Sequence, residues 1–564
     1  MTHTQPLKEK YQYKLSECKD LWLCIFCVIT GSLCLFAFDN FTELYSDELF
    51  QAICVRRYKE SPLGLFSFWI GHLWTSAFGF TILNLRILTS FELLLSMTIT
   101  SAYCYRITRN LKLTSVVFLL GSILLRAGTF AIYNWDTGTY IFDAAAICLL
   151  VSLIRSARWW KALALGFFIG LMTLGRTTSA IMLPLALILI LCFNFKEKKY
   201  KTTLISESLI IAGWICAIIV FSTIILGSPR AYLDSFISDN LISGHSDIHV
   251  LWGHFAMIML MLPYFWCFGI GCLLLSLIVP KLKKTNAVWL LLVWLVFCIL
   301  LQSNLDDTYL KPDINHGVGT PLGLGLLLVI PIFRLFHKNF SADKTTVYCI
   351  WAYAILIFSI AFGSDVYIRR MTVGFTFPLI IASLWDLHNV KIRAYLRTLV
   401  KISLLTFGLV FLSHSIYIIC SRNEMTSFDH PIFKDLYIKS NFIQEMKDSY
   451  QAISAVRRDS TAYAYLGEHL GSELLSGPDK GLSFQNYHRA LYQKHVWDQE
   501  KDKIIPRVDA FIYPLENKYW DLSVIIDEIK DAGFTDSLLV GKAMILYRKS
   551  SNDKTKVTFN KNLN

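Results

Sequence analysis

The feature that most constrains this chain is a series of apolar blocks, each roughly 15–24 residues long, between residues 21 and 420. An α-helix needs about 20 apolar residues to cross a hydrocarbon core of about 30 Å. The chain is 54% hydrophobic and only 17% charged, which is more apolar and less charged than soluble domains usually are. The sequence therefore predicts a polytopic membrane protein.

Basic residues cluster in alternate segments between these blocks, as the positive-inside rule describes. With the N-terminus in the cytoplasm, about thirteen spans put most of these clusters on one side of the membrane. The predicted spans are 21–38, 84–104, 113–132, 138–154, 162–175, 177–195, 203–226, 255–279, 286–302, 319–336, 346–363, 372–387 and 399–420.

One apolar block, 162–195, is interrupted by Arg176. An arginine at the centre of a bilayer costs roughly 2.5–3.5 kcal/mol even on a lenient insertion scale. Two short helices that turn at Gly175-Arg176 would avoid this cost and bring Arg176 to the outer surface. We therefore expect a break at this position.

Two segments are not expected to span. Residues 39–83 form a long outer loop, in which the Trp- and Phe-rich stretch 62–74 suits a helix in the membrane interface. Residues 421–564 are mostly polar, with strand-like runs at 509–514 and 543–547 and a helix-like run at 523–532. The expected fold is an all-α, polytopic membrane domain over 1–420, followed by a small extracytoplasmic α/β domain over 421–564.

The formal net charge of +12 does not indicate nucleic-acid binding, because the basic excess belongs to the loops of the membrane domain. No cysteine or histidine spacing is typical of structural zinc. Residues 245–249, with the pattern His-x-Asp-x-His, are interpreted as a solvated loop. The sequence requires no cofactor. Binding of a divalent cation by the carboxylate oxygens of Asp306-Asp307 is left open.

The informative charged residues lie within a few positions of the predicted outer membrane edge. Transfer of a sugar from a polyprenyl phosphate needs a carboxylate that accepts the proton of the attacking acceptor. It also needs cations that neutralise the departing lipid phosphate. Asp47 or Glu48 can supply the carboxylate; Arg176, Arg369 and Arg370 can supply the cations.

Several of these segments resemble a known superfamily. Tyr45-Ser-Asp-Glu-Leu49 is similar to the Asp-Glu start of the first outer loop in C-type (GT-C) glycosyltransferases, namely the protein O-mannosyltransferases and lipid A aminoarabinose transferases. Lys59-Glu-Ser-Pro-Leu63 resembles their Glu-Lys-Pro-Pro-Leu segment. The stretch 74–86, with Phe-Gly and Leu-Arg, resembles their aromatic helix before the second span. Gly170-Leu-Met-Thr-Leu-Gly-Arg176 resembles their Gly-Leu-x-x-Leu-x-Lys turn.

The resemblance implies that Asp47 is the catalytic carboxylate, that Glu60 and Asp136 are acidic partners in the cavity, and that Arg176 contacts phosphate. The chain departs from the family pattern at three points. Ser61 stands where a Lys is usual, and Arg176 itself replaces a Lys. Asp136 lies in Tyr-Asn-Trp-Asp-Thr-Gly instead of Leu-Asp-Pro, so Asp143 is a rival for its role.

The predicted function is a glycosyltransferase that moves a sugar from a polyprenyl-phosphate donor to a glycan, lipid or protein acceptor. We expect it at the outer face of a bacterial inner membrane, with its C-terminal domain in the periplasm. A lipid-linked glycan flippase or another transporter is an alternative, and so is a glycan polymerase. No internal repeat of the kind common in transporters is visible in the sequence.

Overall fold

The computed structural model describes residues 5–40, 46–60, 64–128, 133–196, 200–234, 263–303, 343–361, 373–387, 390–420, 425–439, 451–452, 463–466, 494–515 and 521–548. Contacts divide the chain into two compact units. The first comprises Met1–Ala37, Pro62–Ile70 and Arg86–Ile419, and the second comprises Phe38–Ser61, Gly71–Leu85 and Cys420–Asn564. The predicted division into functional domains at residue 420 stays a prediction.

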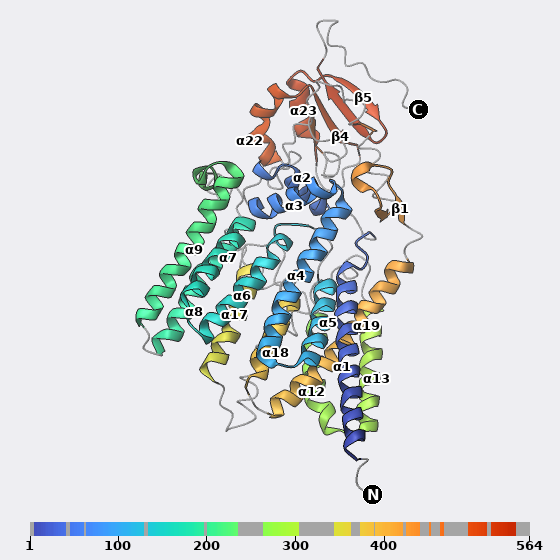
Figure 1. Cartoon of the computed structure of the whole chain (residues 1–564). Coiled ribbons are helices and arrows are strands. Elements are labelled where there is room, and N and C mark those ends of the chain that lie inside the picture. Colours follow the sequence, from blue (N-terminus) through green and yellow to red (C-terminus); the bar gives the residue numbers. More distant parts are fainter. Residues whose placement is uncertain are drawn as a thin grey trace. The chain divides into compact units, whose positions relative to one another are not determined.

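Helices form almost all of the described chain up to residue 420 (Figure 1). They are α1 (Gln5–Phe36), α2 (Ser46–Arg56), η1 (Tyr58–Glu60), α3 (Leu65–Phe78), α4 (Ile82–Thr108), α5 (Leu111–Gly128), η3 (Thr137–Thr139), α6 (Tyr140–Arg155), α7 (Trp159–Gly175), η4 (Thr177–Ile181), α8 (Met182–Lys196), α9 (Tyr200–Leu226), α12 (Pro263–Ile278), η5 (Val279–Lys281), α13 (Lys284–Ser303), α17 (Lys344–Ala361), α18 (Val373–Trp385) and α19 (Val390–Cys420).

Each predicted span that falls on described residues coincides with one of these helices, whereas the span predicted at 319–336 lies outside them. Within the described chain, five helical stretches are long and apolar enough to cross a membrane by length and composition. They are Ile82–Thr108, Thr137–Arg155, Thr177–Phe195, Tyr200–Leu226 and Val390–Ser413. Shorter apolar helices include Trp159–Gly175 and Lys284–Cys298. The chain is a multi-pass membrane protein.

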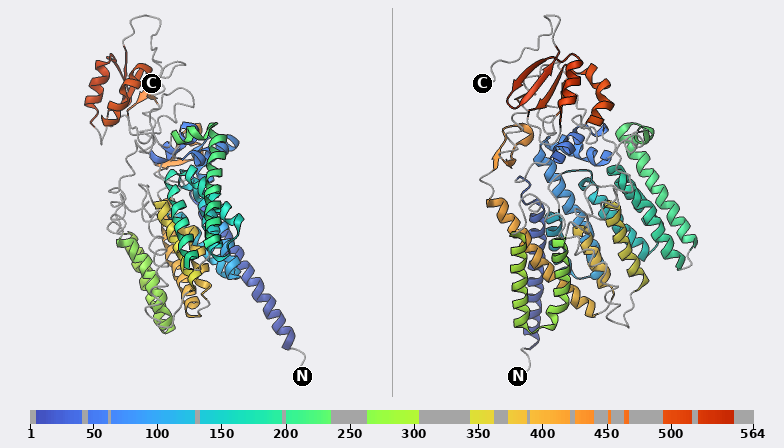
Figure 2. Two further views of the ribbon diagram at one scale, coloured as in Figure 1. Left: turned by 90° about the vertical axis from the view of Figure 1, so that its left-hand side faces the viewer. Right: turned by 180° about the vertical axis from the view of Figure 1, so that it is seen from behind.

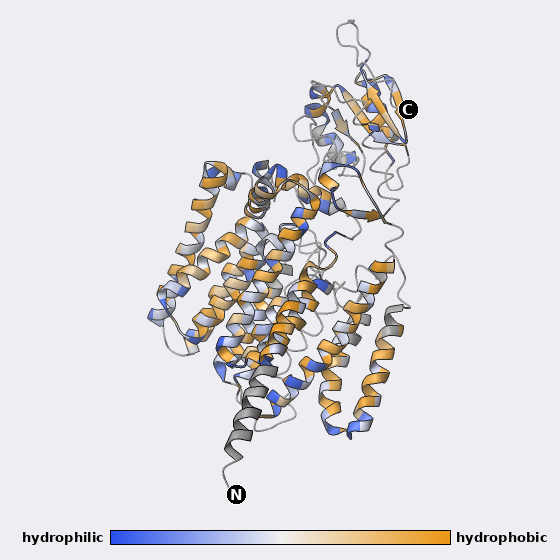
Figure 3. Ribbon diagram, turned by 45° about the vertical axis from the view of Figure 1, so that its right-hand side comes forward, coloured by the Kyte–Doolittle hydropathy of each residue, from blue (hydrophilic) through white to orange (hydrophobic). Residues whose placement is uncertain are grey.

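Large apolar side chains are exposed along several of these helices. Leu204 and Ile224 on α9 are 68% and 59% exposed, and Trp289 and Val293 on α13 are both 64% exposed. Figure 3 shows that hydrophobic residues dominate most of these helices. Soluble monomers rarely leave such extended apolar surfaces in water, and lipid chains are the medium that suits them.

The pair α7 and α9 is packed unusually closely, and the two helices run side by side in Figure 1. A Cβ atom on Gly166 would lie 1.9 Å from the carbonyl oxygen of Ile210, and one on Gly213 would lie 2.2 Å from that of Leu163. Only glycine fits these positions, as is common where membrane helices meet through small residues. This contact fixes α7, whose last residue is Gly175.

The second unit contains the predicted α/β fold, drawn in orange and red in Figure 2. Its four-stranded sheet has the order β3-β4-β6-β5, with β3 parallel to β4 and the other pairs antiparallel. Trp497, Phe511 and Phe534 are fully buried in its core. The elements are β1 (Met425–Ser427), η8 (Pro431–Phe433), β2 (Tyr437–Lys439), β3 (Tyr463–Tyr465), α22 (Lys494–Ile504), η9 (Ile505–Arg507), β4 (Ala510–Pro514), α23 (Ser523–Asp531), β5 (Asp536–Val540) and β6 (Ala543–Tyr547). The strands predicted at 509–514 and 543–547 and the helix predicted at 523–532 are confirmed.

The segment that follows α1 also belongs to the second unit. The backbone N–H of Tyr437 in β2 donates a hydrogen bond to the carbonyl of Asn40, 2.9 Å away. The loop and the C-terminal segment, separated by almost 400 residues, are therefore joined by backbone pairing. The strand β1 extends this pairing by lying antiparallel to β2.

A charged network joins α22 to α23. The Glu528 carboxylate accepts hydrogen bonds from Lys494 at 2.7 Å, Lys501 at 2.8 Å and the Trp497 indole at 2.9 Å. These donors lower the pKa of the Glu528 carboxyl from its ordinary 4.5 to about 2. A carboxyl with a lowered folded-state pKa contributes stability that is present above its unfolded pKa and is lost as the pH falls through the folded pKa.

We expect the α22–α23 pair to lose protection from hydrogen exchange as the pH falls from 4.5 toward 2. The substitution Glu528→Gln should weaken protection at neutral pH and flatten this pH dependence. Exchange measured by mass spectrometry on the full chain, corrected for intrinsic rates, tests this. Asp527→Asn, which changes the neighbouring and more exposed carboxylate, is the control. An unchanged pH profile in Glu528→Gln would contradict the assignment.

Candidate functional site

The site is built around a break between α7 and α8. The helix α7 ends at Gly175, and Arg176 adopts an extended backbone conformation (φ −156°, ψ 110°) before η4 begins. The N–H of Arg176 still bonds to the carbonyl of Met172, and its own carbonyl accepts from Ser179. The predicted break at Gly175-Arg176 is confirmed.

The first turn of α3 and the segment 133–139 both meet this break within the first unit. The hydroxyl of Ser67 lies 3.1 Å from the carbonyl oxygen of Gly175 and 3.3 Å from that of Trp135. The phenol of Tyr133 donates to the carbonyl of Ser67. Three segments that are far apart in the sequence are thus held together by one buried serine.

Two glycines allow this close approach. A Cβ on Gly138 would lie 2.6 Å from the Ser67 side chain and 3.1 Å from the Tyr133 hydroxyl. A Cβ on Gly175 would lie 2.6 Å from Thr139 Cγ2 and 2.8 Å from Ser67 Oγ. Real Cβ atoms do not approach other atoms so closely, so an added methyl group would force the segments apart.

The junction brings Asp136 and Arg176 into a buried ion pair. Arg176 Nη1 lies 2.7 Å from Asp136 Oδ1, and the two side chains are only 6% and 2% exposed. A buried charge without a partner costs several kcal/mol, which the opposite charge offsets. The Arg176 side chain is enclosed and held by Asp136, while its predicted place at the outer edge of the membrane stays a prediction.

Asp143, the rival of Asp136, lies one turn into α6 and is fully buried. Thr139 Oγ1 lies 3.2 Å from Asp143 Oδ2 and 2.8 Å from the carbonyl oxygen of Asp136. Asp143 also interacts electrostatically with both Arg176 and Asp136. Asp136 is the direct ion-pair partner of Arg176. Asp143 places a second carboxyl group close enough to both residues to interact with them electrostatically.

The predicted carboxylates of the outer loop lie in the second unit. Asp47 and Glu48 are consecutive residues of α2. Glu48 is buried, while the side chain of Asp47 lies outside the described residues. Glu60 ends the short helix η1, and its side chain is also outside the described part. A meeting of Asp47 with Arg176 stays a prediction.

The remaining candidates fall on residues that the structure does not describe. These are Arg369 and Arg370, together with the His-x-Asp-x-His loop and Asp306-Asp307. Within the described ranges, no group of three or more His, Cys, Asp or Glu side chains could hold a metal ion. The roles predicted for these arginines stay predictions.

Sequence reasoning missed one buried acid. Glu92 lies inside α4, is 2% exposed, and its Oε2 atom has no hydrogen-bond partner among the described residues. An ionisable residue within a predicted span is itself a signal of function, because burying it in the membrane is costly. Its place in the span 84–104 could have been noticed from the sequence.

Comparison with known proteins supports the expected resemblance over part of the chain. Residues 61–226 match the family described as dolichyl-phosphate-mannose-protein mannosyltransferase. This segment contains Ser67, Asp136, Asp143 and Arg176, and thus the whole junction described above. The match covers well under half of the chain. No curated protein matches the chain in sequence.

Solved structures of membrane glycosyltransferases are similar to the chain at low identity. ArnT from Cupriavidus metallidurans, bound to undecaprenyl phosphate, has a TM-score of 0.41 and 10% identity, over 94% of this chain and 98% of that chain. The Archaeoglobus fulgidus oligosaccharyltransferase tethered to an acceptor peptide has a TM-score of 0.48 and 9% identity, over 88% and 69%. The A. fulgidus AglB complex with an inhibitory peptide and dolichol-phosphate has a TM-score of 0.44 and 10% identity, over 89% and 70%.

The glycine at the break offers a test of the junction. Gly175→Ala would put a methyl group against Thr139 and Ser67, so we expect a loss of about 1–3 kcal/mol of stability. Gly408→Ala in α19 is the control, because a Cβ there meets nothing within 4 Å. Thermal unfolding in detergent measures both variants. Equal melting temperatures for Gly175→Ala and Gly408→Ala would contradict the tight junction.

Proposed function

We propose that this chain is a glycosyltransferase that uses a polyprenyl-phosphate sugar at the outer face of a bacterial inner membrane. The observation that carries the proposal is the buried Asp136–Arg176 pair at a break between two membrane helices. It lies inside the segment that matches the mannosyltransferase family. Burying two charges is costly even when they pair, and lipid-phosphate chemistry needs a fixed cation of this kind.

In the proposed reaction, a hydroxyl or amine of the acceptor attacks the anomeric carbon of the sugar. The bond between that carbon and the phosphate oxygen breaks, and the polyprenyl phosphate leaves with its negative charge. The proton of the acceptor passes to Asp47, or to its neighbour Glu48, acting as the general base. Glu60 and Asp136 are the proposed acidic partners that help to position sugar and acceptor.

Arg176 is the proposed contact for the leaving phosphate. Its guanidinium has five N–H donors, so an ion pair through Nη1 with Asp136 is compatible with further bonds to an oxyanion. Asp136 fixes the orientation of this cation before the donor arrives, and a fixed cation needs no reorganisation as charge develops on the phosphate. Arg369 and Arg370 are proposed to add positive charge at the same headgroup site.

An isosteric substitution that removes the negative charge tests the general base. Asp47→Asn should reduce sugar transfer by at least about a hundredfold, because it removes the proton acceptor, while folding and donor binding remain. Transfer from a radiolabelled polyprenyl-phosphate sugar in proteoliposomes measures this. Asp234→Asn, at an exposed carboxylate after α9, is the matched control and should keep full activity. Full activity in Asp47→Asn would refute Asp47 as the general base, and sugar translocation without a new glycosidic bond would indicate a transporter instead.

The ion pair can be separated from the phosphate contact by a double substitution. Arg176→Gln alone leaves the Asp136 charge buried and should lower stability by about 3–5 kcal/mol. Adding Asp136→Asn removes that charge, so most of the stability should return. Transfer should nevertheless stay low in the double variant, with weakened binding of polyprenyl phosphate. Recovery of both stability and transfer would show that Arg176 is only structural.

A further inference from the structure

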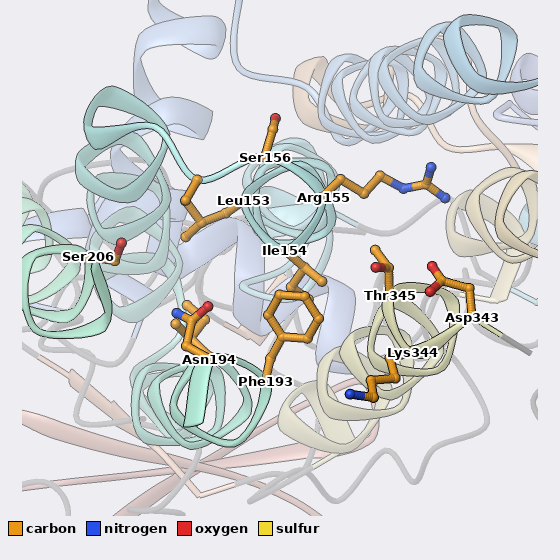
Figure 4. Close-up of a pocket in the computed structure, with 12 residues that line it drawn as sticks. Leu153, Ile154, Arg155, Ser156, Phe193, Asn194, Ser206, Asp343, Lys344 and Thr345 are labelled. Atoms are coloured by element: carbon orange, nitrogen blue, oxygen red, sulfur yellow. The ribbon is translucent and has the colours of Figure 1, made fainter. Parts of the chain in front are cut away.

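A second polar cavity lies at the opposite end of α6 from the Asp136–Arg176 junction. The helix has 16 residues, so its two ends are about 24 Å apart. The cavity has a volume of about 380 Å³ and is drawn in Figure 4. Its walls come from the end of α6, from α8 and α9, and from the start of α17. Its polar lining residues are Arg155, Ser156, Asn194, Ser206, Asp343, Lys344 and Thr345.

Two of these side chains are enclosed and have no hydrogen-bond partner among the described residues. Asn194 on α8 is 7% exposed and Ser206 on α9 is 6% exposed. Their polar atoms are nevertheless not among those sealed inside the protein, and both residues line the cavity, on the same side of it in Figure 4. The hydroxyl of Ser222 on the same helix, by contrast, donates to the carbonyl of Ile218. Enclosed polar groups without a partner cost stability, which favours a ligand that forms hydrogen bonds with them.

The positive charge that faces the cavity does not depend on Arg155. Its guanidinium contacts Asp386 and the thiol of Cys349, and its Nε and Nη2 atoms are sealed from solvent. Lys344, in contrast, is an exposed lining residue at the N-terminus of α17. A helix N-terminus itself attracts negative charge.

Basic residues also outnumber acidic ones around the cavity. The segments that form it, 153–161, 190–207 and 343–345, carry eight basic and three acidic residues. Asp386, which pairs with Arg155, adds a fourth negative charge. The surplus of positive charge favours an anionic ligand over a zwitterionic or cationic one.

The surroundings of the cavity are those of a lipid. The neighbouring surfaces of α8 and α9 expose large apolar side chains, namely Leu191, Phe195, Leu204 and Ile205. In the predicted topology, this end of α6 faces the cytoplasm, next to the basic segment 196–201. Basic pockets between membrane helices on the cytoplasmic side commonly bind anionic lipid headgroups.

We propose that this cavity binds the headgroup of an anionic phospholipid that carries free hydroxyl groups, as phosphatidylglycerol does. Lys344 and the N-terminus of α17 attract the phosphate. The headgroup hydroxyls form hydrogen bonds with Asn194 and Ser206, because an amide and a hydroxyl can each donate and accept. The carboxylate of Asp343 can accept a further bond from a hydroxyl. The acyl chains lie along the apolar surfaces of α8 and α9, and the site is separate from the proposed transfer site.

A double substitution separates binding from packing. Asn194→Leu with Ser206→Ala removes the hydrogen-bonding groups and keeps side chains of similar size. Because these groups have no partner among the described residues, the melting temperature without lipid should stay the same or rise. Ser222→Ala is the matched control on α9, since Ser222 bonds to its own helix and does not line the cavity.

The experiment titrates the full-length protein in detergent with phosphatidylglycerol and counts bound lipid by native mass spectrometry. Phosphatidylethanolamine is the comparison lipid, and glycerol 3-phosphate and inorganic phosphate are the soluble probes. We expect the affinity for phosphatidylglycerol to fall about tenfold or more in the double variant and to persist in Ser222→Ala. Lys344→Gln should reduce the preference for phosphatidylglycerol over phosphatidylethanolamine and weaken the salt dependence of binding.

Four results would overturn the proposal. Unchanged binding of phosphatidylglycerol in the double variant would show that Asn194 and Ser206 do not contact the headgroup. A lower melting temperature of the lipid-free double variant than of Ser222→Ala would assign the two side chains to packing. Phosphatidylethanolamine bound as tightly as phosphatidylglycerol would contradict an anion site. Glycerol 3-phosphate or inorganic phosphate bound as tightly as the lipid would assign the cavity to a soluble ligand.

Discussion

The buried pair between Asp136 and Arg176 is the interaction on which the first unit's candidate site depends. A buried charge requires its partner, so the break after α7 and the segment 133–139 must keep one fixed arrangement. Ser67 adds the first turn of α3 to the same junction, and Gly175 leaves the room that this contact needs. The close packing of α7 on α9 holds α7 in place, and the break follows the last residue of α7.

Much of this organisation could be predicted from the sequence. Apolar blocks and basic clusters predicted where the helices lie. A helix that crosses a membrane needs a minimum apolar length, and the loops on its two sides differ in their content of basic residues; both features can be read from the sequence. The break at Gly175-Arg176 followed from the cost of an arginine in lipid. The strands β4 and β6 and the helix α23 followed from short apolar runs between polar turns.

What could not be predicted depends on contacts between distant segments. Nothing in the local sequence of Ser67 indicates that its hydroxyl meets the carbonyl of Gly175, 108 residues away. The sequence did not indicate that Arg176 pairs with Asp136, 40 positions away, in a buried contact. The Arg155–Asp386 pair joins residues 231 positions apart, and the cavity beside it has no motif. Glu92 could have been noticed, since a carboxyl group inside a span stands out.

The two ends of α6 carry different chemistry, with a carboxylate–arginine junction at one end and a mixed-charge cavity at the other. A structure with a polyprenyl-phosphate sugar bound would test the role of the first of these most directly. We predict the phosphate within hydrogen-bond distance of Arg176 and the anomeric carbon beside Asp47. A phosphate bound away from Arg176, with Asp47 on the opposite face of the membrane, would contradict it.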